Sequence, residues 1–202
     1  MQKISVTHRA TFNYQDASAW SELKSYAIAQ LNWEAFPYRP EVNFQMVHNG
    51  ERLFIQFNVL EKHPVRSLCQ HDQEPVYQDS CVEFFFLDSE GYYHNFEFNS
   101  RGVCLSAQGK ERHHRQSRTA SELAEIIRLP SGITRTAGAY QWSLIVGIPF
   151  AALGICRKHK YRANFYKCGD LCQAAHYLSW HQIKTSKPDF HRPEYFGEIE
   201  IE

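Results

Sequence analysis

Two acidic side chains in one aromatic-rich stretch are the first candidates for chemistry. Residues 77–99 read YQDSCVEFFFLDSEGYYHNFEFN, in which two strand-like runs flank the segment from Asp88 to Gly91. A loop of this length, with Gly91 in the left-handed conformation, predicts a β-hairpin that places Glu83 directly opposite Glu97. Opposed like charges destabilise a strand pair, so these acids need a cation, a ligand rich in hydrogen-bond donors, or solvent around them.

The same register assigns the rest of the hairpin to two faces. One face is expected to be core, with the pairs Phe86 and His94, Phe84 and Phe96, and Val82 and Phe98. The other face carries Phe85 and Asn95, Glu83 and Glu97, and Cys81 and Asn99. This second face is either a solvated outer surface or a binding surface.

Two functions use the acidic pair directly. Opposed strand residues bring carboxyl groups to roughly 5 Å, which is the separation found in a retaining glycosidase. Alternatively, the hydroxyls of a bound sugar are hydrogen-bonded by Glu83, Glu97, Asn95 and Asn99 while aromatic rings cover its apolar face. Tyr77 and Trp180 could supply those rings, although packing in the core is the more common fate of a tryptophan.

Metal binding is a weaker alternative. Cys168, Cys172 and His176 are spaced i, i+4 and i+8, but Gly169 makes the helix that would align them for zinc improbable. Calcium could be held by loop oxygens, without EF-hand spacing, and haem ligation would have to use Met46, the one internal methionine. Calcium is therefore the one metal that we keep as an expectation.

Alternating apolar residues predict the elements that position these side chains. Helical spacing appears in residues 18–31, and Thr119 to Glu122 forms a capping box that predicts a second short helix. Strands are expected at residues 4–13, 43–60 (a hairpin with an Asn-Gly turn), 77–99, 103–106, 141–148, 161–166, 175–180 and 196–201. The chain is therefore predicted to be a single all-β domain over residues 1–202, an antiparallel, jelly-roll-like β-sandwich with one or two short helices.

The amino-acid composition excludes some classes of binding partner. Lys plus Arg and Asp plus Glu both number 22, so the long-range field that nucleic-acid binding needs is missing. No apolar run reaches the roughly 18 residues of a membrane span, and the first residues have no apolar signal region. We therefore expect no nucleic-acid or membrane partner, and a cytoplasmic location unless a signal has been removed. The six cysteines are expected to be mostly small buried apolar residues.

Ordered motifs over about residues 30–202 resemble the family 9 carbohydrate-binding modules, and in particular their stand-alone relatives in gut bacteria. These motifs are residues 79–85, 93–99 with Gly102, 142–150 with Leu153 and Gly154, 164–167, Ser179 with Trp180, and 190–197. The resemblance implies a β-sandwich without catalysis that grips the end of a glucan or xylan chain between two aromatic rings, with structural calcium nearby.

The resemblance also implies roles for individual residues. Tyr77 and Trp180 fall at the positions of the two rings, and Glu83 is the acid that follows Asp79 and Ser80. By position, the resemblance also implies that Glu97 and Asn99 supply carboxylate and amide contacts to the sugar. A relative that kept the fold but lost sugar binding, and serves as an interaction domain, is the remaining alternative.

Overall fold

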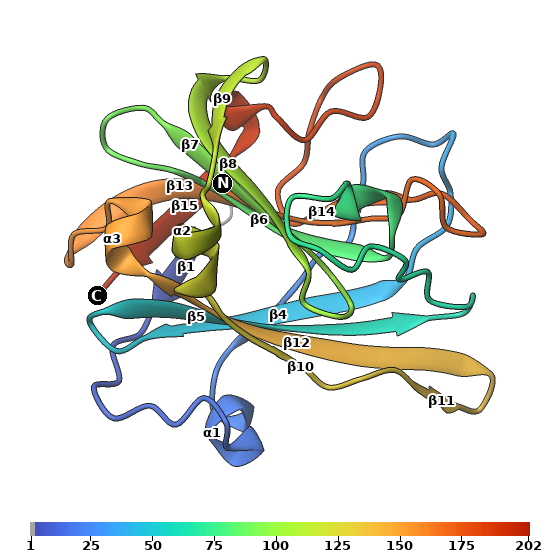
Figure 1. The fold of residues 1–202 in the computed structure, drawn as a ribbon, viewed down its shortest axis with the longest axis horizontal. Helices are drawn as coiled ribbons and strands as arrows, with labels where there is room; N and C mark the ends of the chain where they lie inside the picture. The colour runs from blue at the N-terminus through green and yellow to red at the C-terminus, as the bar shows by residue number, and fades with distance from the viewer. Residues whose placement is uncertain (1–2) are drawn as a thin grey trace.

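In the computed structural model, residues 3–202 are described, and they form two β-sheets packed face to face (Figure 1). The larger sheet has nine strands among these residues. Its order is β1 (Lys3–Val6), β15 (Gly197–Ile201), β13 (His159–Cys168), β6 (Cys81–Leu87), β7 (Tyr93–Asn99), β8 (Cys104–Glu111) and β9 (His114–Ser117), with β14 (Tyr177–Ser179) and β3 (Gln30–Leu31) beside β13. Its pairs are antiparallel except that of β1 with β15.

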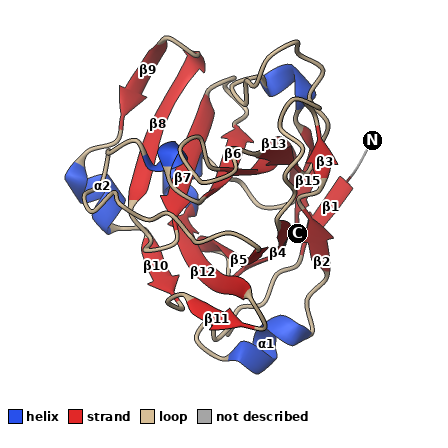
Figure 2. Ribbon diagram, turned by 90° about the vertical axis from the view of Figure 1, so that its right-hand side faces the viewer, coloured by secondary structure: helices blue, strands red, loops and turns tan. Residues whose placement is uncertain are grey.

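The smaller sheet is antiparallel and has six strands in the described part of the chain. Its order is β10 (Ile127–Pro130), β12 (Ala139–Pro149), β5 (Arg52–Glu61), β4 (Glu41–His48) and β2 (Ser25–Ala27), with β11 (Thr134–Thr136) beside β12. Figure 2 shows this sheet lying beneath the larger one. The predicted β-sandwich is therefore confirmed.

The core lies between the sheets because alternate residues of each strand face inward. Phe165 of β13 stacks on Phe44 of β4 with 3.8 Å between ring centroids, and Phe84 of β6 lies 5.1 Å from Phe165. Trp142, Leu144, Val146 and Ile148 of β12 are all buried, as their alternation predicts. One continuous apolar cluster thus joins the two sheets.

The hairpin register is confirmed residue by residue. Strands β6 and β7 pair Glu83 with Glu97 and Phe84 with Phe96, and the remaining pairs match the prediction. Gly91 has a φ of 83°, and the carboxylate of Asp88 accepts hydrogen bonds from the backbone N–H groups of Glu90 and Tyr92. These contacts fix the loop length, and the loop length fixes which side chains share a face.

The outer face of the larger sheet is largely covered, apart from the pocket described below. The segment before β4 and the loops after β5 and β14 cover it and form a second apolar cluster around Phe85, Tyr166 and Phe190. As a result, Glu83 and Glu97 are only 3% and 4% exposed. The acids must therefore be explained as a buried pair.

Three short α-helices occur among the described residues, rather than one or two: α1 (Ala17–Ser21), α2 (Ala120–Ala124) and α3 (Phe150–Leu153). There are also two 3₁₀ turns, η1 (Val76–Gln78) and η2 (Pro193–Tyr195). The capping box at Thr119 is present, with its hydroxyl and the Glu122 carboxylate each accepting from the other's backbone N–H. No helix in this part of the chain has the length and hydropathy to span a membrane.

The helix predicted over residues 18–31 forms only in its first turn, because α1 ends at Ser21. The side-chain amide of Gln45 donates to the carbonyl oxygens of Trp20 and Leu23, which ends the helix by satisfying free acceptors there. The chain then turns into β2, which pairs with β4. Tertiary pairing outweighs local helical spacing in this segment.

Trp180 lies in the core. The prediction that its ring lines the binding site is therefore wrong. Its side chain is 3% exposed and makes edge-on contacts with Phe165 and Phe44, with centroids 5.9 and 6.4 Å away. Gly197 leaves room for the indole, since a Cβ there would overlap the ring. Trp180 therefore supports the fold and does not face a ligand.

We expect Trp180→Ala to lower the free energy of unfolding by about 3–5 kcal/mol, because it opens a large cavity beside Phe165. Trp180→Phe should cost less, because it keeps an aromatic ring there. Urea unfolding of the three proteins measures both changes. Equal stability of Trp180→Ala and the unmodified chain would contradict the core assignment.

Candidate functional site

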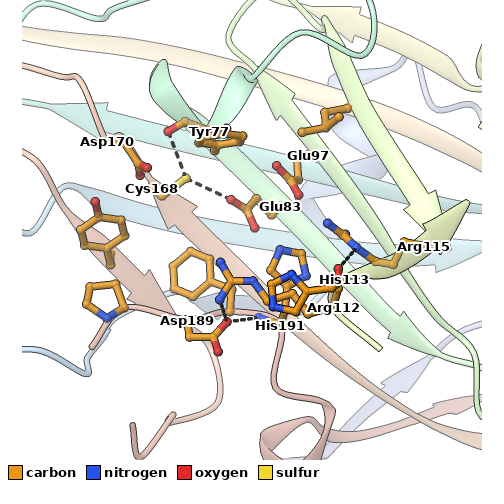
Figure 3. Close-up of a pocket in the computed structure, with 14 residues that line it drawn as sticks. Tyr77, Glu83, Glu97, Arg112, His113, Arg115, Cys168, Asp170, Asp189 and His191 are labelled. Atoms are coloured by element: carbon orange, nitrogen blue, oxygen red, sulfur yellow. Dashed lines mark hydrogen bonds and ion pairs between the residues drawn. The ribbon is translucent and has the colours of Figure 1, made fainter. Parts of the chain in front are cut away.

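A pocket of about 410 Å³ opens on the outer face of the larger sheet (Figure 3). Its floor comes from strands: Glu83 of β6, Glu97 of β7, Leu105 of β8 and Cys168 of β13. Its walls come from η1, the turn between β8 and β9, the connection after β13 with Tyr177 of β14, and the loop before η2. The volume lies within the range of small-molecule binding sites.

The acids of the floor are held by neighbours in the sheet. The thiol of Cys168 donates to Oε1 of Glu83 at 3.0 Å. The side-chain amide of Asn95 donates to Oε1 of Glu97 at 3.0 Å, and its oxygen accepts from Arg115 at 2.5 Å. Each carboxyl is therefore fixed through one oxygen, while the residue itself lines the pocket.

Burial changes the protonation of Glu83 and Glu97 in the floor of the pocket. Loss of solvation, together with the nearby Cys168 and Glu97, raises the pKa of Glu83 well above its usual value. Burial also raises the pKa of Glu97 to about 7, although Arg115 and the Asn95 hydrogen bond oppose that rise. Near neutral pH Glu83 is therefore held in its uncharged form, which can donate as well as accept hydrogen bonds, whereas Glu97 is divided between its charged and uncharged forms.

Aromatic side chains stand at the edge of the pocket. Tyr77 belongs to η1 and is 38% exposed, and the carbonyl of the same residue accepts from the backbone N–H of Asp170 at 3.0 Å. Tyr177 of β14 and Phe190 also line the pocket. Tyr77 therefore presents a partly open ring from a segment that is anchored to the chain after β13.

One wall is cationic. Arg112 and His113, in the turn between β8 and β9, and Arg115 of β9 line it. Arg112 forms an ion pair with Asp189 at 3.0 Å, which ties this turn to the opposite loop. Burial, with Arg115 and Arg112 nearby, lowers the pKa of His191 to about 3. His191 therefore faces the pocket as a neutral ring.

Three of the five residues predicted from the sequence come together here: Tyr77, Glu83 and Glu97. Trp180 does not, for the reason given above. Side chains alternate between the two faces along β14 and the residue after it. Leu178 and Trp180 therefore face the core, while Tyr177 faces the pocket. Tyr177 was missed, although strict alternation of its strand is a signal that could have identified it.

Asn99 is also outside the pocket, so its predicted place in the site is wrong. Its amide donates to the Asp79 carboxylate and the Cys69 carbonyl, both at 3.1 Å. Its side-chain oxygen accepts from the backbone N–H groups of Arg101 and Val103. Asn99 closes the turn after β7 and ties down the loop before η1, which leaves its side chain no free group for a ligand.

The metal sets considered from the sequence do not form. His176 is engaged with the ammonium of Lys167 at 2.8 Å, and Cys168 points to Glu83, so the zinc set with Cys172 is not assembled. Met46 is packed in the core. Among residues 3–202 one group alone brings three His, Cys, Asp or Glu ligand atoms together, and two of its members are thiols, which calcium disfavours. Calcium remains a prediction without identified ligands.

Comparison with known proteins finds one matching family model and several similar structures. The model of Carbohydrate-binding family 9 matches residues 15–201. The structure of a candidate carbohydrate-binding protein from Bacteroides uniformis ATCC 8492 is 29% identical with a TM-score of 0.90, over 100% of this chain and 99% of that one. None of the curated proteins matches.

Two further structures are of a family 9 carbohydrate-binding module from Caldicellulosiruptor kristjanssonii. The glucose complex has a TM-score of 0.61 over 100% of this chain and 96% of that one, at 12% identity. The cellotriose complex has a TM-score of 0.63 over 99% and 93% of the two chains, also at 12% identity. At this identity the likeness shows a shared fold.

Glu97→Gln should flatten the dependence of stability on pH. Because Glu97 has a pKa of about 7 when folded against 4.5 ordinarily, the folded chain binds its proton more tightly, and stability falls as pH rises from about 4.5 to about 7. The shift corresponds to about 3 kcal/mol for this group. Urea unfolding between pH 4 and 8 measures the slope.

The matched control is Glu90→Gln, which changes an exposed acid in the hairpin loop. This variant should keep the slope of the unmodified chain. A slope that is the same in Glu97→Gln as in the unmodified chain would contradict the assignment of Glu97 as a carboxyl with a raised pKa.

Proposed function

Because this chain belongs to carbohydrate-binding family 9, we propose that its pocket binds the end of a glycan without transforming it. The observation that carries the proposal is the combination of an open Tyr77 ring with the carboxyl pair Glu83 and Glu97 in one pocket. Sugars have an apolar C–H face and a rim of hydroxyl groups. A ring beside two carboxyls matches both features.

Each part of the pocket has a role in this proposal. Tyr77 stacks on one sugar face, and Tyr177 takes the position of second ring that the sequence had assigned to Trp180. Glu97 and the second oxygen of Glu83 hydrogen-bond hydroxyl groups. Arg112 and Arg115 donate to ring or glycosidic oxygens at the mouth.

A second hollow, of about 590 Å³, is larger but less suited to sugar. It lies beside α3 and is lined by Asp88, His94, Arg118 and others, with no Tyr, Trp or Phe among its lining residues. A sugar there would have no aromatic face to stack on. Chemistry therefore favours the smaller pocket over the larger one.

The glycosidase alternative uses the same acids but fits their surroundings less well. A retaining mechanism needs one ionised carboxylate as nucleophile and one protonated acid. Burial raises the pKa of Glu97 to about 7 and that of Glu83 well above its usual value, so neither acid is held firmly in the ionised form that the nucleophile needs, and the Cys168 thiol already donates to Glu83. We therefore propose binding as the function, with hydrolysis as the alternative to be tested.

Tyr77→Ala should weaken sugar binding about tenfold or more, because it removes the stacking face, and this equals about 1.4 kcal/mol. Tyr77→Phe should bind nearly as well as the unmodified chain. Calorimetric titration with glucose, cello-oligosaccharides and xylo-oligosaccharides, guided by a glycan array, measures the affinities. The neighbours' complexes with glucose and cellotriose make these the first probes.

Tyr92→Ala is the matched control, since Tyr92 is also 38% exposed but lies in the hairpin outside the pocket. Its affinity should be unchanged. Absence of binding at millimolar sugar across the array would contradict the proposal and favour an interaction domain. Release of reducing ends that stops in Glu83→Gln would favour the hydrolase.

A further inference from the structure

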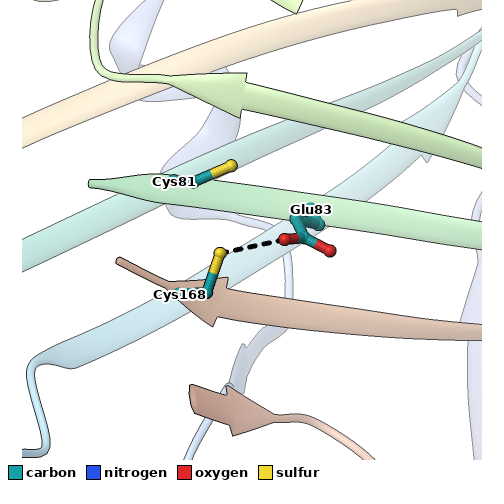
Figure 4. A group of neighbouring side chains, drawn as sticks. All are labelled: Cys81, Glu83 and Cys168. Atoms are coloured by element: carbon teal, nitrogen blue, oxygen red, sulfur yellow. Dashed lines mark hydrogen bonds between the residues drawn. The ribbon is translucent and has the colours of Figure 1, made fainter. Parts of the chain in front are cut away.

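Two thiols and a carboxyl converge beneath the pocket (Figure 4). Cys81 and Glu83 are two residues apart on β6 and so share a face of the sheet, and Cys168 of β13 pairs directly with Cys81. Their ligand atoms all lie within 4.8 Å of one another, and all three residues are buried. This is the one cluster of its kind among residues 3–202.

The spacing is close to that of a zinc site. Zinc binds sulfur at about 2.3 Å and carboxylate oxygen at about 2.0–2.2 Å in tetrahedral geometry, which puts the ligand atoms about 3.5–3.8 Å apart. The Cys168 sulfur is now 3.0 Å from Glu83 Oε1, and the widest separation in the group does not exceed 4.8 Å. Movements of roughly 1 Å by side chains would therefore suffice to ligate an ion.

We propose that Cys81, Glu83 and Cys168 bind one zinc ion, with a fourth position that opens into the pocket. Two of the ligands, Glu83 and Cys168, line the pocket, whereas Cys81 lies behind them. An ion held by all three therefore has protein on one side and the cavity on the other. Three protein ligands with one open position is the arrangement of zinc sites that exchange a water or a ligand.

Binding is a proton exchange without electron transfer. The thiols of Cys81 and Cys168 and the carboxyl of Glu83, which burial keeps protonated, each release a proton to solvent as their bonds to zinc form. Two thiolates and one carboxylate around Zn²⁺ carry a net charge of −1. Lys167 is already ion-paired with the buried Glu61 at 3.6 Å, so the positive groups that face this charge are Arg112 and Arg115, which line the pocket.

Two thiolates and one carboxylate favour some metal ions over others. Thiolate ligands favour zinc and copper(I) over calcium and magnesium, while the carboxylate suits zinc better than copper(I). The inference concerns the floor of the pocket and does not require that a sugar binds. If both ligands are bound, a sugar hydroxyl could occupy the open position on the ion.

Cobalt(II) is the probe, because thiolate ligation to cobalt gives a near-ultraviolet charge-transfer band and tetrahedral geometry gives strong visible bands. The full chain, reduced with a phosphine, should bind one Co²⁺ with both signals and lose them when Zn²⁺ is added. Cys81→Ala and Cys168→Ala should each weaken Co²⁺ binding at least tenfold and reduce the charge-transfer band.

Two variants control for other thiols: Cys156→Ala removes the exposed cysteine, and Cys104→Ala removes a buried one in the sandwich core. Both should keep the full spectrum. If a ligand variant fails to fold, alkylation of the unmodified chain replaces it, and Zn²⁺ should protect Cys81 and Cys168 but not Cys156. Absence of a thiolate band, its persistence at full intensity in Cys81→Ala, its loss in Cys156→Ala, or alkylation of Cys81 and Cys168 that proceeds at the same rate with and without zinc would overturn the proposal.

Discussion

Side chains alternate along paired strands, so the register of the hairpin β6–β7 decides what lies on each face of the larger sheet. Phe84 and Phe96 face the core between the two sheets, and Glu83 and Glu97 face the outer side of the larger sheet. A slip of one residue would put two acids into the aromatic core. The turn that ends at Gly91 prevents this slip, so the floor of the pocket is determined by the same contacts that determine the core.

Register alone would leave the acids in solvent, and the covering loops change their chemistry. Asp79 is central to this cover, because its carboxylate accepts from the backbone N–H groups of Leu68 and Cys69 and from Asn99. These bonds hold the chain before η1 against the sheet. The same carboxyls that would be ordinary surface acids are therefore buried hydrogen-bonding groups.

Local patterns predicted the elements better than the site. The hairpin turns, the Thr119 capping box and the alternation of β12 are encoded within a few residues each, and these predictions were confirmed. The site depends on loops that close over the sheet from distant positions, for which no short-range pattern exists. Trp180 shows the limit, since its place in the core depends on contacts with Phe165 and Phe44, which lie on strands distant from it in the sequence.

The pocket draws its floor from regular strands and its walls mostly from four separate connections of the chain. Evolution can therefore alter the two parts at different rates. Changes in the turn between β8 and β9, or in the loop that carries Asp189, would reshape the rim without disturbing strand pairing. Lineages descended from one such scaffold could diversify in what they recognise while inheriting an unchanged base.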